Sequence, residues 1–271
     1  MGLASLVNKQ VKQKGPEEVV VDAIMNSIKV LNPPSQHSNA NIKPSKIQCE
    51  RQMYYILTNA PANAVTTTDP KLTMIQKVGT YCHLMIQEAM SKANPSMIIY
   101  RDPHDLVKEA EAKGLHTHIV PTTHSEDNKY ECHCYNDEYD LSFMWDGALY
   151  IKDLSTIVEI KSEDHFKNIK RLAPDEGHIE QATCYSLALG VDDVVFLYLN
   201  RNYLNIKPYL VHVTPEMKQV VIDKINRVNA AKAAGDLPPK ITCKACKYCD
   251  FTRICRGDFN PLDNPEKPTE V

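Results

Sequence analysis

The chain has 271 residues, 43% of them hydrophobic and 24% charged, which is typical of a folded globular protein with one large domain or two small ones. Its 31 Lys and Arg against 34 Asp and Glu give a formal net charge of −3. This balance excludes the bulk attraction of a polycation for nucleic acid and restricts any nucleic-acid surface to a local patch.

No segment is expected to cross or anchor in a membrane. The longest apolar run, 194–199, is far shorter than the roughly 20 residues of a membrane-spanning helix. The first residues lack the apolar stretch of an export signal. We therefore expect no membrane partner and a cytoplasmic location, in the host cytoplasm if the source is viral.

The N-terminal part is predicted to be helical. Apolar residues at helical spacing predict an amphipathic helix over 16–31, and the Pro-, Ser- and Asn-rich stretch 32–43 predicts a linker. A second helix is expected over 44–57, beginning at a Pro-Ser cap, and a third over 70–92.

The remainder alternates strands and helices. In chain order, the patterns predict strands over 139–151 and 156–160 joined by a turn at 152–155, a helix over 177–189, strands over 194–200 and 206–213, and a helix over 215–234. This order predicts an α/β fold with a mixed central β-sheet flanked by helices. A Leu-Pro-Pro segment at 237–239 ends the last helix.

Two carboxylates and a lysine are predicted to meet on the first two strands. Asp146 lies within the first strand, and Glu159 and Lys161 end the second. Residues two apart in a strand face the same side, and hairpin pairing brings Asp146 beside them. Mg²⁺ and Mn²⁺ prefer carboxylate oxygens with positions left for water and phosphate, and a lysine can orient an attacking water. The alternative is a surface hairpin with a solvated Glu and Lys.

These residues and a Gln-x3-Tyr pair on the following helix resemble the motifs of the PD-(D/E)xK nucleases, in their RecB-like branch. Gln181 and Tyr185 are four apart and share a helix face. The resemblance implies a restriction-endonuclease-like core and assigns catalytic roles to Asp146, Glu159, Lys161, Gln181 and Tyr185. For Tyr185 the alternative is core packing.

The same resemblance implies a metal ligand upstream. RecB-like nucleases carry a histidine on a helix, and His83 in the predicted helix 70–92 matches it. The resemblance implies that His83, Asp146, Glu159 and the backbone carbonyl of Ile160 hold one or two Mg²⁺ or Mn²⁺ ions. A single helical histidine is otherwise more often structural than a ligand.

Cysteines crowd the C-terminal end. Cys246, Cys249 and Cys255 place three thiols within ten residues of a chain without an export signal, which favours metal binding over disulfides. Three thiolates suit zinc or an iron–sulfur cluster and require a fourth ligand. Cys243 would complete a compact zinc knuckle, whereas Cys49 lies near the other end of the chain. Cys132 and Cys134 are interpreted as strand residues.

The cysteine pattern resembles the iron–sulfur class of RecB-like nucleases, which includes the AddB nuclease domain and the small CRISPR-associated exonucleases. There, one N-terminal cysteine joins three C-terminal ones in a [4Fe–4S] cluster. The resemblance implies that Cys49, Cys246, Cys249 and Cys255 hold such a cluster as a staple between the N- and C-terminal segments, with Zn²⁺ as the alternative.

The resemblance covers 45–256, which predicts a nuclease domain there, an N-terminal helix and linker over 1–44, and a flexible tail over 257–271. It implies a metal-dependent DNA nuclease, and for members of this size an exonuclease that hydrolyses phosphodiester bonds from single-stranded DNA ends. The alternatives are a non-catalytic DNA-binding or adaptor module on the same fold, and a zinc-binding interaction protein.

Several features of the biology stay open. The sequence contains no nucleotide-binding Gly-x4-Gly-Lys-[Ser/Thr] motif, so any helicase motor, or a recombination or CRISPR partner, would act in trans. Lys167, Lys170 and Arg171 are expected near the entrance for DNA, or alternatively in a solvated loop. Oligomer formation and the pathway, whether repair, recombination, CRISPR adaptation or viral DNA metabolism, are not determined by these residues.

Overall fold

A computed structural model describes residues 16–28, 41–62, 70–121 and 130–257. The chain divides into two units, residues 1–35 with 65–78, and residues 36–64 with 79–271. The first contains helix α1 (Pro16–Ile28) and the start of α3 (Pro70–Ser91). Both predicted helices are confirmed within the described residues. Of the predicted linker over 32–43, residues 32–40 lie outside them, and of the predicted tail over 257–271, all residues beyond Gly257 do. No helix in the described ranges is long and apolar enough to cross a membrane.

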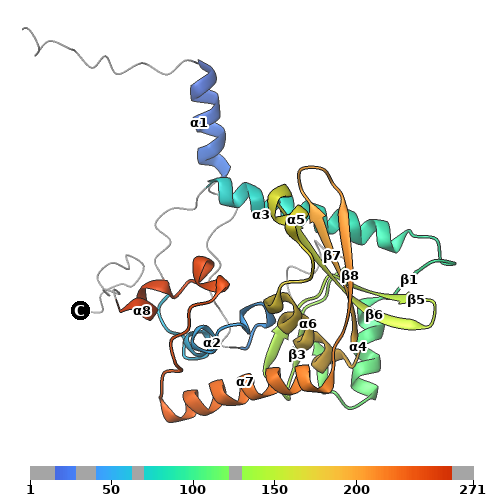
Figure 1. Cartoon of the computed structure of the whole chain (residues 1–271), viewed down its shortest axis with the longest axis vertical. Coiled ribbons are helices and arrows are strands. Elements are labelled where there is room, and N and C mark those ends of the chain that lie inside the picture. Colours follow the sequence, from blue (N-terminus) through green and yellow to red (C-terminus); the bar gives the residue numbers. More distant parts are fainter. Residues whose placement is uncertain (1–15, 29–40, 63–69, 122–129, 258–271) are drawn as a thin grey trace, which may run out of the picture. The chain divides into compact units, whose positions relative to one another are not determined.

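The second unit is built on a five-stranded mixed sheet. In spatial order its strands are β1 (Ile99–Tyr100), β5 (Gly147–Ile151), β6 (Leu154–Glu163), β7 (Asp193–Asn200) and β8 (Ile206–His212). Only the β6–β7 pair is parallel. A parallel pair needs a crossover connection, which α5 (His165–Lys170) and α6 (Glu176–Leu189) supply. The predicted α/β class with a mixed central sheet is therefore confirmed (Figure 1).

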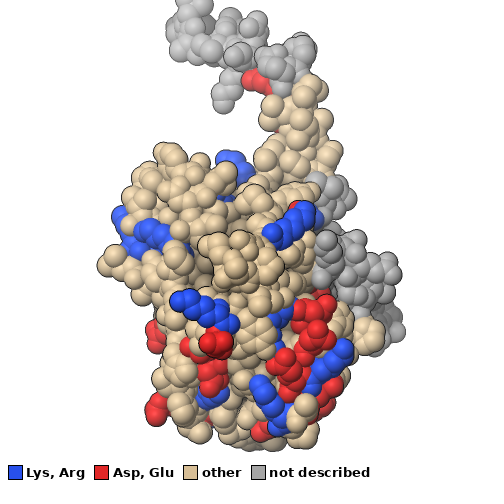
Figure 2. Space-filling view, turned by 90° about the vertical axis from the view of Figure 1, so that its right-hand side faces the viewer, with Lys and Arg blue, Asp and Glu red and all other residues tan. Residues whose placement is uncertain are grey.

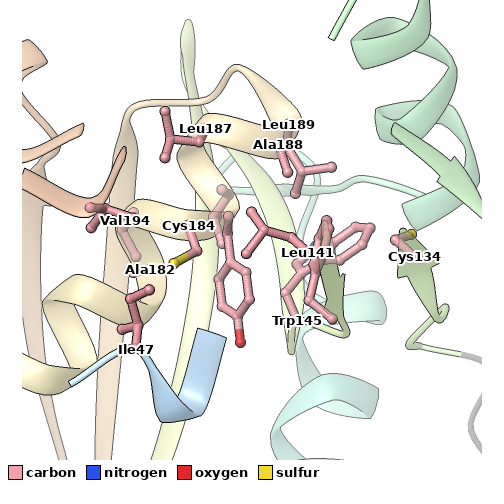
Figure 3. Close-up of a cluster of buried hydrophobic side chains, with 14 of the residues drawn as sticks. Ile47, Cys134, Leu141, Trp145, Ala182, Cys184, Leu187, Ala188, Leu189 and Val194 are labelled. Carbon is pink, nitrogen blue, oxygen red and sulfur yellow. The ribbon is translucent and has the colours of Figure 1, made fainter. Parts of the chain in front are cut away.

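Helices cover both faces of this sheet. On β6, Ile157 belongs to the larger core with α6, while its neighbour Val158 packs in a second core with Ile86 of α3. Successive strand residues point to opposite faces, so one strand supports both cores. Figure 3 shows the larger core, where Ala182 and Leu189 of α6 lie among buried apolar side chains that include Trp145. Each large side chain buried in this way contributes about 1.5–3 kcal/mol to folding.

The predicted strand over 139–151 is wrong as a single strand. Its first part is β4 (Leu141–Phe143), which pairs with β3 (Cys134–Asn136) and, through it, with β2 (Thr117–Ile119) in a separate three-stranded sheet. Its second part is β5 of the five-stranded sheet. The chain leaves one sheet and joins the other over 144–146. At this point the Asp146 side chain accepts the hydrogen bond of the Ile160 N–H, which in a continuous strand pair would go to a backbone carbonyl of the neighbouring strand.

The predicted helix over 44–57 begins later than expected. A single 3-10 turn, η3 (Pro44–Lys46), is followed by extended backbone at Cys49 and then by α2 (Glu50–Leu57). The interruption lets the chain pass close to α6, where a β-carbon on Gly177 would lie 2.0 Å from the Gln48 side chain. Any larger residue at 177 would have to displace the Gln48 side chain.

Segments from the two ends of the second unit pack together. Tyr55 of α2 and Phe251, beside α8 (Thr252–Arg256), have ring centroids 5.3 Å apart, and both are buried. Arg51 Nε donates to the Pro238 carbonyl at 2.7 Å. The long helix α7 (Pro215–Ala234) contributes Arg227, whose Nη2 lies 2.7 Å from Glu50 Oε1. The remaining elements are α4 (Pro103–Ala112) and the 3-10 segment η4 (Lys244–Tyr248).

Candidate active site

Asp146 lies where the two sheets meet, and two groups hydrogen-bond to its carboxylate. His83 Nδ1 on α3 donates to Asp146 Oδ1 at 2.9 Å. The Ile160 backbone N–H on β6 donates to Asp146 Oδ2 at 2.6 Å. Because the N–H and C=O of one strand residue point to the same side, the Ile160 carbonyl faces the same edge of β6. The structure thus brings together three of the four predicted metal-binding residues.

Glu159 and Lys161 form the other half of the site. Glu159 is 2% exposed, and Lys161 Nζ lies 2.5 Å from Glu159 Oε1. The same Nζ donates to Gln181 Oε1 at 3.2 Å, and Gln181 Nε2 in turn donates to the Tyr185 hydroxyl at 2.6 Å. Tyr185 is buried in the core, so it holds the Gln181 amide in place as well as packing. The predicted residues on β6 and α6 therefore form one line of contacts.

The buried ionisable groups of this site shift one another's pKa values. Burial raises the pKa of Glu159 to about 7, and the Asp146 charge adds to this effect while Lys161 opposes it. Burial would lower the pKa of Lys161, but the Glu159 and Asp146 charges outweigh it and leave the pKa raised. Burial would also lower the pKa of His83, but the hydrogen bond to Asp146 outweighs burial, so the pKa of His83 is raised. A buried carboxylate beside a second carboxylate suits a site for an additional cation.

Glu131 joins the site although no sequence pattern indicated it. Ligand atoms of His83, Glu131 and Asp146 all lie within 4.8 Å of one another. Gln87 connects them, because its Nε2 donates to Glu131 Oε1 at 2.7 Å and to the Asp146 carbonyl at 2.9 Å. Gln87 is fully buried and follows His83 by one helical turn, and this spacing on α3 was the only available signal.

Of the three cationic residues expected near a DNA entrance, Arg171 is placed elsewhere. Its side chain is 4% exposed and forms two hydrogen bonds with Glu163, at 2.8 and 2.6 Å. It also lies 3.8 Å from the centre of the Tyr198 ring. Arg171 therefore has a structural role, because the buried Glu163 carboxylate needs a positive charge beside it. Lys167 and Lys170 are exposed.

The surface shows no single large field of one sign on the face in Figure 2. Acidic and basic side chains are interspersed over the lower part of this face, where α4 lies. On α4, the Lys108 Nζ and Asp105 Oδ1 atoms are 3.3 Å apart. Contacts with an anionic polymer on this face therefore depend on local groups, as the net charge of −3 also indicates.

The four cysteines predicted to bind a cluster line one cavity of about 100 Å³. Cys49 caps the start of α2, and Cys246, Cys249 and Cys255 come from the C-terminal segment. The structure brings these thiols to a common cavity but does not hold them at the spacing of a closed metal cluster, so the iron–sulfur prediction is not confirmed. Cys243 is not among the cavity's lining residues, although its Sγ lies 3.8 Å from that of Cys246.

No known family profile and no curated protein matches the sequence. Among solved structures, SSO0001 is similar with a TM-score of 0.46 and 12% identity, over 89% of this chain and 98% of that one. An alkaline exonuclease from Laribacter hongkongensis gives a TM-score of 0.36 and 11% identity, over 72% and 89%. Its complex with dAMP gives 0.35 and 12%, over 72% and 89%. These similarities are too weak to assign an activity, so the site is interpreted from its own side chains.

Proposed function

We propose that this chain is a divalent-metal-dependent nuclease that hydrolyses phosphodiester bonds in DNA. The observation that carries the proposal is the convergence of carboxylates, an imidazole and a lysine on one buried point between β5, β6, α3 and α6. Asp146 and Glu159 are separated in sequence but come together, because Asp146 directly precedes β5 and Gly147 of β5 pairs with Val158, the neighbour of Glu159 on β6. A surface hairpin would not bury Glu159 to 2% exposure.

The donor set fits a hard divalent cation. Carboxylates of Asp146, Glu159 and Glu131, with His83 and the Ile160 carbonyl, are the ligands that Mn²⁺ and Mg²⁺ accept. A bound ion of this kind would supply charge stabilisation to the phosphoryl group under attack. No other class of cofactor is needed to explain this set.

The remaining residues have roles that need no direct contact with the ion. Lys161 projects from the same face of β6 as Glu159 and positions the attacking water beside the phosphate. Gln181 holds the Lys161 ammonium through its carbonyl, and Tyr185 holds the Gln181 amide. We further propose a RecB-like enzyme of residues 45–256 that degrades single-stranded DNA from an end.

The direct test is hydrolysis of end-labelled single- and double-stranded DNA by the purified full chain with Mn²⁺ or Mg²⁺. We expect cleavage that EDTA abolishes, and release of label at one end as short products in the first turnovers. Internal cleavage would instead identify an endonuclease. Binding without cleavage under all metal conditions would contradict the proposal and favour the non-catalytic adaptor.

Gln87 should control how tightly the ion is held. Replacing it with leucine keeps the buried volume but removes the donor shared by Glu131 and the Asp146 carbonyl. Loss of such an outer hydrogen bond typically weakens metal binding about 10–100-fold. Isothermal titration of the metal-free protein with Mn²⁺ measures this directly. Gln219→Leu, at an exposed position of α7 in the same unit, serves as the control. Equal Mn²⁺ affinity in both variants would show that Gln87 only packs.

We also propose that Cys49, Cys246, Cys249 and Cys255 hold a [4Fe–4S] cluster, with zinc as the alternative. Support comes from the shared cavity and from the four thiols, a donor set that suits either group. Iron, sulfide and zinc analysis of anaerobically purified protein separates the two. Cys49→Ser should lower metal content and destabilise the contact between α2 and the C-terminal segment, whereas Cys184→Ser should leave metal content unchanged. Metal content that depends on Cys243 rather than Cys49 would identify a compact zinc knuckle.

A further inference from the structure

Aromatic and apolar side chains are exposed on α5 and on the turn between β7 and β8, which lie side by side at one end of the sheet (Figure 1). Phe166 is 72% exposed and Tyr203 is 66% exposed. Both rings contact the His165 ring, with centroid distances of 5.7 and 4.6 Å. The three rings therefore form one aromatic row. Exposed aliphatic side chains on or next to the same elements are Ile169, Leu172, Leu204 and Ile206.

Hydrogen bonds hold the two elements together beneath this row. The His165 backbone N–H donates to Asn202 Oδ1 at 2.9 Å, and the His165 ring lies 3.1 Å from the Asn200 side-chain amide. Lys207 Nζ on β8 donates to the Asn168 carbonyl of α5 at 2.7 Å. The row is thus fixed in place, and little conformational entropy is lost when a ligand stacks on it.

The charge around the aromatic row is mainly positive. Lys170 is exposed and forms no ion pair within the ranges that the structure describes, and Lys167 is half-exposed with Nζ 3.4 Å from Asp175 and 3.8 Å from Glu163. The exposed acid of this segment, Asp164, is engaged as the cap of α5 and accepts the Lys167 N–H. Glu163 is buried against Arg171. Cationic side chains next to exposed aromatic rings are the combination that binds single-stranded nucleic acid.

The aromatic row lies close in sequence to the strand that carries two residues of the candidate active site. Helix α5 follows β6, the strand that carries Glu159 and Lys161. Four residues of strand separate Glu159 from the end of β6, a distance of about 13 Å at about 3.3 Å per residue. A strand with one phosphate at Lys161 therefore reaches the aromatic row within a few nucleotides.

We infer that Phe166 and Tyr203 stack on bases of a single-stranded nucleic acid while Lys167 and Lys170 contact its phosphates. This inference rests on the proposed nuclease function, for which it supplies the path of the substrate. It also gives a reason for a preference for unpaired strands, since the bases of a duplex are already stacked on one another and offer no free faces to these rings.

The test is binding of a fluorescein-labelled 20-nucleotide single strand to the full chain in EDTA, followed by fluorescence anisotropy. Phe166→Ala and Tyr203→Ala should each weaken binding about 5- to 150-fold, the range for loss of one stacked base. Phe166→Trp should bind the single strand as tightly as the wild type does, because the larger ring keeps a face for stacking. Met97→Ala removes an apolar side chain that is 70% exposed far along the chain from this row, and should bind as the wild type does.

A second substrate separates this inference from the proposed function. Bis(4-nitrophenyl) phosphate has the phosphodiester but no bases, so the stacking variants should hydrolyse it with Mn²⁺ at the wild-type rate. If the wild type hydrolyses neither substrate, the nuclease proposal fails while the binding result still decides the inference. Unchanged single-strand affinity in both alanine variants, or no binding by the wild type, overturns the inference. A change in sedimentation mass with unchanged affinity would also overturn it and would assign the surface to a second copy of the chain.

Discussion

Replacing Lys161 with methionine should reduce DNA hydrolysis about 10²–10³-fold, the usual cost of removing one group that stabilises or orients the reacting atoms. The Lys161 ammonium lies between Glu159 and Gln181, so its loss removes both the charge beside the phosphate and the group that positions water. Single-turnover cleavage of labelled DNA at saturating Mn²⁺ measures the effect. Mn²⁺ affinity should persist, because Lys161 is not a ligand.

Two further variants sharpen this result. Lys161→Arg keeps a positive charge that is never released, so it should restore activity only if charge alone is required. Lys108→Met removes an exposed lysine of α4 and should cleave at the wild-type rate. Full cleavage by Lys161→Met would show that the catalytic centre lies elsewhere in the molecule.

Breaking the pair between Arg171 and Glu163 should have the largest effect on stability. Both side chains are 4% exposed, so replacing Arg171 with methionine leaves a buried carboxylate without its partner. Such a loss costs about 3–5 kcal/mol in the free energy of unfolding. Urea denaturation monitored by circular dichroism and by Trp145 fluorescence, which reports on the larger core, measures the change.

A double variant distinguishes charge from packing. Arg171→Met combined with Glu163→Gln removes both charges, and we expect it to be more stable than Arg171→Met alone, since no unpaired charge remains. The exposed Lys108 and Asp105 pair of α4 provides the control, because solvent-exposed ion pairs contribute little. A destabilisation by Arg171→Met no larger than that of the control would show that Arg171 is available for other partners.

Long elements with strong periodicity were predictable from the sequence, and short ones were not. The helix α7 has a Thr214 cap, Pro215 at its start and Gly235 in a left-handed conformation at its end, and all three are visible in the sequence. The two-residue β1 carries no such pattern, and the six-residue α5 has only its Asp164 cap. Elements this short depend more on tertiary contacts than on a local signal, so they were not predicted.

The residues of the candidate site likewise differ in how far the sequence predicted them. Glu159 and Lys161 lie two apart on one strand, and Gln181 and Tyr185 lie four apart on one helix, so spacing alone predicted that each pair shares a face. Glu131 meets His83 only through the folding of the three-stranded sheet, which a single sequence does not reveal. The break at Asp146 was missed because both flanking segments are extended, and an extended pattern does not say to which sheet a strand belongs.

The contact between α2 and the C-terminal segment has a consequence for how the protein is made. Tyr55 of α2 packs against Phe251, and Glu50 of α2 pairs with Arg227 of α7, so both partners of α2 leave the ribosome only after the whole sheet has been synthesised. The stretch of about 190 residues from α2 to Phe251 takes about 10–40 s at about 5–20 residues per second. All the active-site residues from His83 to Tyr185 are synthesised within that interval, before Phe251. Vectorial synthesis therefore orders assembly, with the catalytic sheet first and the closure of the cysteine cavity last.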